Sequence, residues 1–326
     1  MEGKVTSSQV AERAGVSRSA VSRVFTPGAS ASAETVARVR QAAEELGYRP
    51  NALARSLLTG SSKMIGLVVS YLDNHFYPPL IEKLSRALQE EGYHILMFLA
   101  GNDGPEADAV VEDILDYQVD GLVLASVGLS SNLAKRCGVM GVPVVLLNRH
   151  LGVADEVAVI SDSRAGGRLA ADHLVATGAQ RIAHIAGSEE ASTQREREAG
   201  FIEGLTAAGQ SLFVREVGNF DAEQAREAAR AMFTDPTERP DAVFVANDFM
   251  ALVVLDTLRY ELGLSVPEDV RVVGFDNVPA AAFPAYQLTT IAQDPDAMAA
   301  RTMACLMGRE VPEGPLPVRL IERGST

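Results

Sequence analysis

The feature that most constrains this chain is a pair of short helix signals, joined by a tight turn, close to its start. Residues 6–9 read Thr-Ser-Ser-Gln and form a capping box, in which a hydroxyl and a glutamine satisfy free backbone amides. Gly15 can adopt the left-handed conformation that ends a helix. Ser17 then caps a second helix after a turn of a few residues. Two short helices with a glycine-containing turn predict a helix-turn-helix.

The second predicted helix has one apolar and one polar face. Its apolar positions are Ala20, Val21, Val24 and Phe25. Its polar face carries two arginines near the helix start, where side chains of a helix-turn-helix reach base edges in the major groove of DNA. The residues expected to contact DNA in this part are Thr6, Ser7, Ser17, Arg18, Ser19, Ser22 and Arg23.

A third helix is expected between a Ser32 cap and Gly47, and a further short segment follows it. Pro50 suits a helix start, but residues 51–58 make only about two turns, too few for a stable isolated helix. This segment should therefore fold only against a partner. Its candidate DNA contacts are Asn51, Ala54, Arg55 and Leu57.

Several motifs together resemble the lactose-repressor (LacI/GalR) family of bacterial transcription regulators. They are Ala-Gly-Val-Ser at 14–17, Val-Ser-Arg-Val at 21–24, Glu-Leu-Gly-Tyr-Arg-Pro-Asn-Ala-Leu-Ala-Arg-Ser-Leu at 45–57, and later landmarks at 65–69, 272–277 and 288–291. The resemblance covers almost the whole chain. It implies a cytoplasmic, ligand-controlled repressor that binds a palindromic operator as a homodimer. It also places Leu57 at the leucine that wedges into the central minor-groove step and kinks the DNA.

Charge is distributed unevenly along the chain. The net charge of −14 at pH 7 argues at first against a nucleic-acid partner. However, residues 1–60 carry a net +3, so the rest carries −17. A basic head on an acidic body concentrates the attraction for phosphate in one place.

The length of the chain and its apolar segments indicate how many domains it has and argue against a secreted or membrane-spanning protein. A chain of 326 residues is long enough for two or three domains. Its start lacks the apolar core of a signal peptide, and no apolar run reaches membrane-spanning length. The two cysteines, Cys137 and Cys305, are far apart, and we expect buried free thiols.

Beyond residue 63, strand and helix patterns alternate in two successive series, which predicts two doubly wound lobes with parallel sheets. The expected strands are 64–70, 94–99, 121–125, 143–147, 157–160, 182–186, 213–217, 242–246, 270–275 and 318–321. The expected helices are 77–91, 105–117, 129–139, 165–177, 193–208, 222–233, 248–262 and 295–307. The resemblance implies a periplasmic-binding-protein-like body in which the chain crosses between lobes three times, one crossing lying near 288–291.

The predicted fold is thus a small all-α helix-turn-helix domain followed by an α/β two-lobed, periplasmic-binding-protein-like domain. We expect the DNA-binding domain at 1–49, the hinge helix and linker at 50–62, and the effector-binding and dimerisation domain at 63–326. Within that last domain, lobe one is expected at about 63–161 plus 292–326, and lobe two at about 162–291.

Ligands of open α/β sheets bind beyond the carboxyl ends of the strands, where this sequence places many polar residues. The expected effector contacts are Asn74, Phe76, Ser126, Asn148, Arg149, Asp162, Thr193, Arg197, Phe220, Asn247 and Asp276. The resemblance matches Arg197, Asn247 and Asp276 to ligand-binding positions, and such groups suit neighbouring hydroxyls. Asp248, by contrast, can be a helix cap. We expect a sugar, sugar acid, polyol or nucleoside, although the absence of Trp makes stacking on an indole impossible.

Two other classes of protein compete with a regulator. A solute-binding protein for a sugar-type ligand would need a secretion signal and no helix-turn-helix, and this chain shows the reverse. An α/β enzyme such as a sugar kinase would need a phosphate loop or catalytic carboxylates, and neither appears. The five histidines do not fall at zinc spacings, and only His75 lies beside a predicted strand end. We therefore expect no catalysis, no cofactor and no metal.

Overall fold

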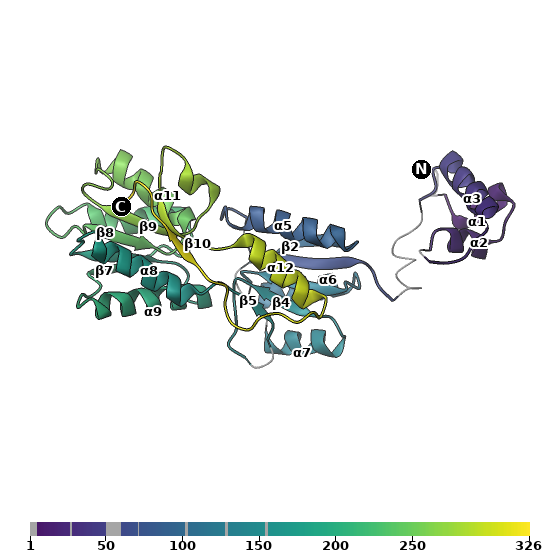
Figure 1. Ribbon diagram of the computed structural model, residues 1–326, viewed down its shortest axis with the longest axis horizontal. Coiled ribbons are helices and arrows are strands. Elements are labelled where there is room, and N and C mark those ends of the chain that lie inside the picture. The colour runs from purple at the N-terminus through teal and green to yellow at the C-terminus, as the bar shows by residue number, and fades with distance from the viewer. Residues whose placement is uncertain are drawn as a thin grey trace. The chain divides into compact units, whose positions relative to one another are not determined.

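A computed structural model describes residues 5–26, 28–49, 60–70, 72–101, 104–127, 130–153 and 156–326. The chain divides into two compact units, Met1–Lys63 and Met64–Thr326 (Figure 1). The predicted hinge contacts Asn51, Ala54, Arg55 and Leu57 lie outside the described residues.

The first unit contains the three helices that the sequence predicts: α1 at Ser7–Ala14, α2 at Arg18–Val24 and α3 at Ala33–Leu46. The capping box of α1 is present, and Gly15 ends that helix at φ 64°. Ser17 and Ser32 cap α2 and α3 with their hydroxyls. Local sequence signals therefore set all three helices.

Long-range contacts hold these helices together. Val10, Val21 and Val39 are buried against one another, one from each helix. Arg38 of α3 donates to the carbonyl oxygen of Gly15 at 2.9 Å, so α3 satisfies the backbone at the turn between α1 and α2. The turn that orients α2 is thus fixed from outside as well as by its own glycine.

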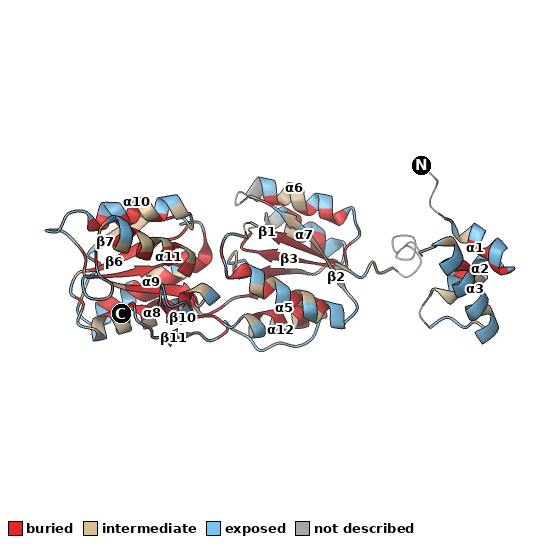
Figure 2. Cartoon of the chain, turned by 90° about the horizontal axis from the view of Figure 1, so that it is seen from above, coloured by how far each residue is buried: buried red, intermediate tan, exposed pale blue. Residues whose placement is uncertain are grey.

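Lobe one is built on a parallel sheet with strand order β2-β1-β3-β4-β5. Its strands are β1 (Met64–Val69), β2 (His94–Leu99), β3 (Gly121–Ala125), β4 (Val144–Leu147) and β5 (Ala158–Val159). Its helices are α5 (Tyr77–Glu90), α6 (Gly104–Leu115), α7 (Ser131–Val139) and α12 (Pro295–Leu306). α5 and α12 cover one face of the sheet, and α6 and α7 cover the other (Figure 2).

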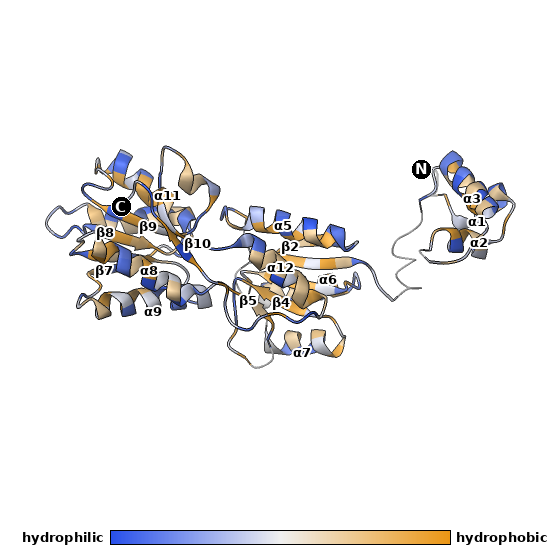
Figure 3. Ribbon diagram, viewed as in Figure 1, coloured by the Kyte–Doolittle hydropathy of each residue, from blue (hydrophilic) through white to orange (hydrophobic). Residues whose placement is uncertain are grey.

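Lobe two is built on a sheet with strand order β11-β10-β9-β8-β6-β7, in which only β11 is antiparallel to its neighbour. The strands are β6 (Ile182–Ala186), β7 (Val214–Val217), β8 (Ala242–Val245), β9 (Arg271–Asp276), β10 (Thr289–Ala292) and β11 (Arg319–Ile321). Helices α8 (Ser163–Ala176) and α9 (Ser192–Ala207) pack on one face. Helices α10 (Ala222–Phe233) and α11 (Asp248–Asp256) pack on the other. The buried strands carry the most apolar sequence of the chain (Figure 3).

Three segments connect the lobes, at 160–162, 293–294 and 307–318. The first and third run side by side, since the Leu316 amide donates to the Ile160 carbonyl at 2.8 Å. The crossing expected near 288–291 is misplaced, because β10 is a full member of the second sheet and the chain leaves that lobe only after Ala292.

The expected assignment of all of 292–326 to lobe one is also wrong. α12 packs there, and Arg309 just after it donates to Glu91 at the end of α5 at 2.6 Å. β11 pairs with β10 in lobe two, with Thr290 opposite Ile321, and the buried Ser325 hydroxyl accepts from the Thr289 amide at 2.8 Å. An exposed edge of the second sheet offers free backbone groups, and the returning chain satisfies them.

The segment 248–262, expected to be one α-helix, is not α-helical throughout. After α11, a π-helical turn occupies Thr257–Glu261. The period of the apolar residues does not reveal such a turn. No helix in the described part of the chain is long and apolar enough to cross a membrane.

Candidate functional site

The polar face of α2 is exposed, as the sequence predicts. Arg18, Ser19, Ser22 and Arg23 all face solvent, and Val21 beneath them is buried. Ser17 caps α2, since its hydroxyl accepts from the Ala20 amide at 3.2 Å. The unit therefore presents a rigid helix with two arginines, which suits entry into a major groove.

In the second unit, side chains from both sheets meet through residues that follow their strands. Asn74 comes after β1 in lobe one, and its side chain hydrogen-bonds to Asp276 at the end of β9 in lobe two. His75 contacts the ring of Phe249 edge-on, with centroids 6.3 Å apart. We call this meeting of the two sheet ends the inter-lobe site.

Arg197 and Asp276 form the charged centre of the inter-lobe site. Both side chains are almost fully buried, and Arg197 Nη2 lies 3.7 Å from Asp276 Oδ1. Arg197 also donates to the Ala246 carbonyl at 2.6 Å, and its guanidinium lies 3.6 Å from the ring centroid of Phe275. Gln293 Nε2 donates to Asp276 Oδ1 at 2.7 Å.

Close packing of two helices fixes Arg197. A Cβ built on Gly167 of α8 would lie 1.9 Å from the Arg197 carbonyl oxygen, and one on Gly200 of α9 would lie 1.9 Å from that of Arg164. Only glycines allow this approach of one backbone to the other. Gly167 and Gly200 thus allow the close packing of α8 and α9 that positions the Arg197 guanidinium.

A second polar group, from lobe one, surrounds Tyr77. Its hydroxyl accepts from Asn148 Nδ2 at 3.2 Å and hydrogen-bonds to the Ser126 side chain. Ser126 and Asn148 follow β3 and β4 with positive φ, at 60° and 57°, conformations that turn the chain sharply at a strand end. Arg149 lies close enough to act on Tyr77 through its charge.

Four buried polar atoms on residues that follow strands at the inter-lobe site have no hydrogen-bond partner among the described residues. They are Asn148 Oδ1, Arg149 Nε, Asn247 Nδ2 and Gln293 Oε1. An unpaired buried polar group costs stability, so native proteins seldom leave several together without a purpose. Two of these atoms donate and two accept, so a ligand that does both would satisfy them.

Burial dominates the acid–base properties here. It raises the pKa of Asp276 to about 7, although Arg197 opposes the rise, and the neighbouring Asp248 adds to it. Burial also raises the pKa of Asp248 to about 6. Near neutral pH the inter-lobe site can therefore hold a carboxyl group in either protonation state.

A further contact joins the lobes at the rim of the inter-lobe site. His150 follows β4, and its Nε2 lies 2.9 Å from Glu196 Oε1 on α9. The His150 amide donates to the Ser192 hydroxyl at 3.1 Å. These contacts join the strand ends of lobe one to the first turns of α9.

The structure also describes the surroundings of four further expected contacts. Asp162 caps α8, accepting from the Ala165 amide at 2.8 Å. Phe220 has φ 58°, and its ring fills the space that a Cβ on Gly187 would occupy, after β6. Thr193 is buried in the first turn of α9. Phe76 is buried beside Tyr77, with ring centroids 5.6 Å apart.

Asp248 is not the helix cap that its position suggested. Asn247 caps α11, since its Oδ1 accepts from the Met250 amide at 3.0 Å. The fully buried Asp248 accepts instead from the Thr290 hydroxyl at 2.6 Å and the Val278 amide at 2.9 Å.

Sequence reasoning missed Tyr77 and Gln293. Gln293 directly follows β10, so the rule that polar residues collect at strand ends could have found it had 289–292 been taken as a sheet strand. Tyr77 lies inside α5, and nothing in its local pattern distinguishes it from a core residue.

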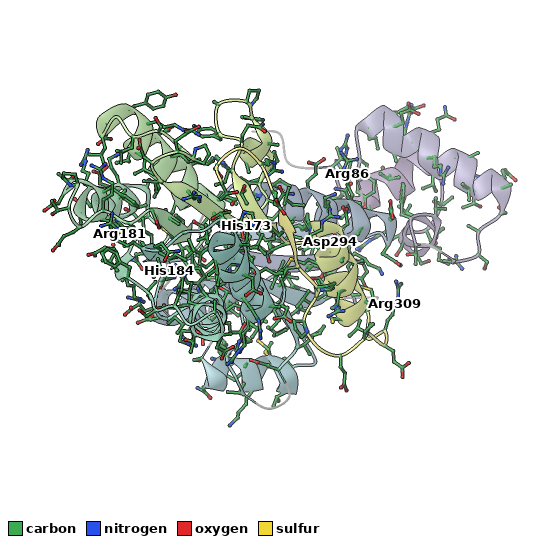
Figure 4. The ribbon with its side chains drawn as sticks, turned by 60° about the vertical axis from the view of Figure 1, so that its left-hand side comes forward. Arg86, His173, Arg181, His184, Asp294 and Arg309 are labelled. Carbon is green, nitrogen blue, oxygen red and sulfur yellow. The ribbon has the colours of Figure 1, made fainter. Side chains whose placement is uncertain are left out.

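Other histidines have packing roles. His184, labelled in lobe two in Figure 4, is fully buried, and its Nδ1 lies 2.9 Å from the Phe244 carbonyl oxygen. Burial lowers its pKa to about 4. Among the described residues, no group of three or more His, Cys, Asp or Glu is placed to hold a metal ion.

Comparison with known proteins agrees with both units. The family model described as "Bacterial regulatory proteins, lacI family" matches residues 8–51, and that of the "Periplasmic binding protein-like domain" matches residues 171–326. The chain is 35% identical to the HTH-type transcriptional regulator CelR of Thermobifida fusca, over 97% of this chain and 95% of that protein. It is 32% identical to the ribose operon repressor of Escherichia coli K12, over 93% and 92%.

Solved structures give the same result. The lac repressor dimer bound to operator and the anti-inducer ONPF matches with a TM-score of 0.85 and 30% identity, over 99% of each chain. A complex of the regulator CelR with cellobiose matches with a TM-score of 0.71 and 32% identity, over 99% of this chain and 100% of that one.

Proposed function

This chain belongs to the lacI family of bacterial regulatory proteins, and we propose that it is a cytoplasmic homodimeric repressor controlled by a polyhydroxylated small molecule at the inter-lobe site. The family is one of DNA-binding transcription regulators rather than enzymes or solute carriers. A solute-binding protein would have no helix-turn-helix, so the family match at residues 8–51 argues against that alternative.

The observation that carries the choice of effector is the set of four unpaired buried atoms. Asn148 Oδ1 and Gln293 Oε1 need donors, while Arg149 Nε and Asn247 Nδ2 need acceptors. A carboxylate or phosphate group alone only accepts, whereas a hydroxyl does both. A molecule with several neighbouring hydroxyls therefore fits best, as sugars do.

Relatives support a sugar. One similar structure contains cellobiose, and a similar protein is named a ribose operon repressor. In this chain we assign the polar contacts to Asn148, Arg149, Arg197, Asn247, Asp276 and Gln293. Phe76 and Phe220 would then supply apolar walls for the carbon skeleton.

For DNA we assign base contacts to Arg18, Ser19, Ser22 and Arg23, and backbone contacts to Thr6, Ser7 and Ser17. In the hinge, Asn51, Ala54, Arg55 and Leu57 would meet the minor groove once two hinges pack together over DNA. An effector that changes how the lobes sit would change the spacing of the two hinges, and so control whether they fold.

A homodimer fits an exposed apolar edge of lobe one. β2 is the edge strand of its sheet, and Met97 and Leu99 on it are 47% and 59% exposed. An edge strand with unpaired backbone groups and exposed apolar side chains readily pairs with another chain. The similar lac repressor structure is a dimer.

Thermal-shift screening of sugars, sugar acids, polyols and nucleosides tests the effector class. A true effector present at about 100 times its dissociation constant should stabilise the body by about 2.7 kcal/mol. The Arg197→Ala variant should show no shift with the same compound, yet bind operator DNA normally in a gel-shift assay with a palindrome from the protein's own upstream region. Stabilisation only by anions without hydroxyls would contradict the proposal.

A further inference from the structure

We infer that Asp248 and Arg323 are positioning residues that fix the direction in which Asp276 presents its carboxylate at the inter-lobe site. The inference rests on the proposed function only in taking Asp276 to be an effector contact. Neither residue belongs to the set of contacts assigned above, and Arg323 lies near the end of the chain.

The backbone at Asp276 is strained. Asp276 has φ 125° and the next residue, Asn277, has φ 56°. Residues other than glycine seldom adopt a φ near 125°, whereas Asn adopts the left-handed region more readily than most residues, so the strain lies mainly at Asp276 and persists only when surrounding groups hold it. This turn leads the chain out of β9 and sets where the Asp276 side chain points.

Asp248 holds the turn from the α11 side. One of its carboxylate oxygens accepts from the Val278 amide at 2.9 Å. The other oxygen accepts from the Thr290 hydroxyl of β10 at 2.6 Å. One fully buried side chain thus ties the turn to a neighbouring strand.

Gly274 leaves the space that the Asp248 carboxylate occupies. A Cβ built on Gly274 of β9 would lie 2.2 Å from Asp248 Oδ1, so the carboxylate fills the space beside a glycine. Any side chain at Gly274 would displace it. The glycine in the Gly-Phe-Asp motif therefore makes room for the carboxylate that holds the following turn.

Arg323 holds the same turn through the returning C-terminal segment. Its Nη2 donates to Asn277 Oδ1 at 2.6 Å, and its Nη1 donates to the Leu288 carbonyl at 2.7 Å. Its backbone amide donates to the Thr289 hydroxyl at 2.9 Å. Arg323 therefore holds the Asn277 side chain, while the Asn277 amide donates at 3.4 Å to the Thr290 hydroxyl, which in turn donates to Asp248.

The consequence is geometric. Without either contact, residues 276 and 277 can relax toward ordinary negative φ, which rotates the Asp276 side chain away from Arg197 and Gln293. Binding groups must be held to within about 0.5 Å to work, so such a rotation should weaken effector binding while the fold persists.

The test compares Asp248→Ala, Asp248→Asn and Arg323→Met in the full chain, with Arg319→Met as the matched control. Arg319 lies in the same C-terminal segment, on β11, and is exposed. Hydrogen exchange of peptides covering 276–278 gives a readout that needs no effector. D-ribose and cellobiose serve as binding probes.

We expect faster exchange at 276–278 in Asp248→Ala and Arg323→Met, and at least tenfold weaker binding of whichever probe the wild type binds. Asp248→Asn should recover both, because its amide oxygen can still accept from Val278 while its nitrogen donates to Thr290. Operator binding and the Arg319→Met control should be unchanged.

Wild-type exchange at 276–278 in both Asp248→Ala and Arg323→Met would overturn the inference. So would faster exchange without weaker probe binding, since the two residues would then serve the fold alone. If the wild type binds neither probe, these two sugars are not its effectors, and the exchange measurements alone decide whether these two residues hold the turn.

Discussion

Replacing Asp276 by Asn should make the body less sensitive to alkaline pH while it abolishes the effector response. Burial raises the pKa of Asp276 from 3.8 to about 7 in the folded protein. The folded state therefore binds this proton more tightly than the unfolded chain does. The resulting stabilisation is fully present below pH 3.8, the unfolded value, and is lost as the pH rises through about 7.

The two pKa values set the magnitude. Linkage between 3.8 and about 7 gives a loss of about 2 kcal/mol of unfolding free energy between about pH 5.5 and about pH 8.5. Asp248, with its pKa raised to about 6, should add a loss of about 1 kcal/mol over the same range. An Asn at 276 resembles the neutral acid, so the variant should retain only the smaller loss.

Urea unfolding of the full chain, followed by circular dichroism at both pH values, measures the difference. Asp172→Asn is a suitable control, because Asp172 is an exposed carboxyl on α8. Equal losses in the wild type and Asp276→Asn would refute the reasoning, since Asp276 would then be ionised in the folded state throughout. In a gel-shift assay, effector should no longer change operator binding by the variant.

Four further outcomes follow from the two units. Arg18→Ala should relax preference at one base pair of each half-site in binding-site selection, because a two-pronged arginine–guanine contact is worth about 1–3 kcal/mol of discrimination; uniform weakening would instead indicate a phosphate contact. Leu57→Ala should weaken operator binding and reduce DNA bending without changing effector affinity. In the wild type, the backbone amides of residues 51–58 should exchange hydrogen fast without DNA and slowly with operator. Light scattering at micromolar concentration should give a homodimer, and a tetramer would contradict this. His150→Ala removes the 2.9 Å contact between the lobes that His150 makes with Glu196. The lobes should then separate more easily, so the radius of gyration of the ligand-free protein should increase in X-ray scattering. An unchanged radius would mean that the contact does not hold the lobes together.

The sequence alone determined the features that depend on neighbours along the chain. Caps at Thr6, Ser17 and Ser32 and the stop at Gly15 gave the three N-terminal helices, because capping involves groups only a few residues apart. Likewise, apolar runs gave β2, β3 and β6 with their observed bounds. Residues that follow strands gave most of the inter-lobe site, since parallel strands end at one edge of a sheet.

Only the tertiary structure decided which partners those residues have. β11 could not be assigned to lobe two from its sequence, because an edge strand takes its place from the free backbone of β10. Nor could Asp248 be separated from a helix cap, since its partners lie 30 and 42 residues away. Gln293 and Tyr77 join the site through contacts with residues 17 and 71 positions away in the sequence. Local signals fix backbone conformation over a few residues, whereas the pairing of buried polar groups depends on how distant elements pack, which the pattern of residue types does not encode.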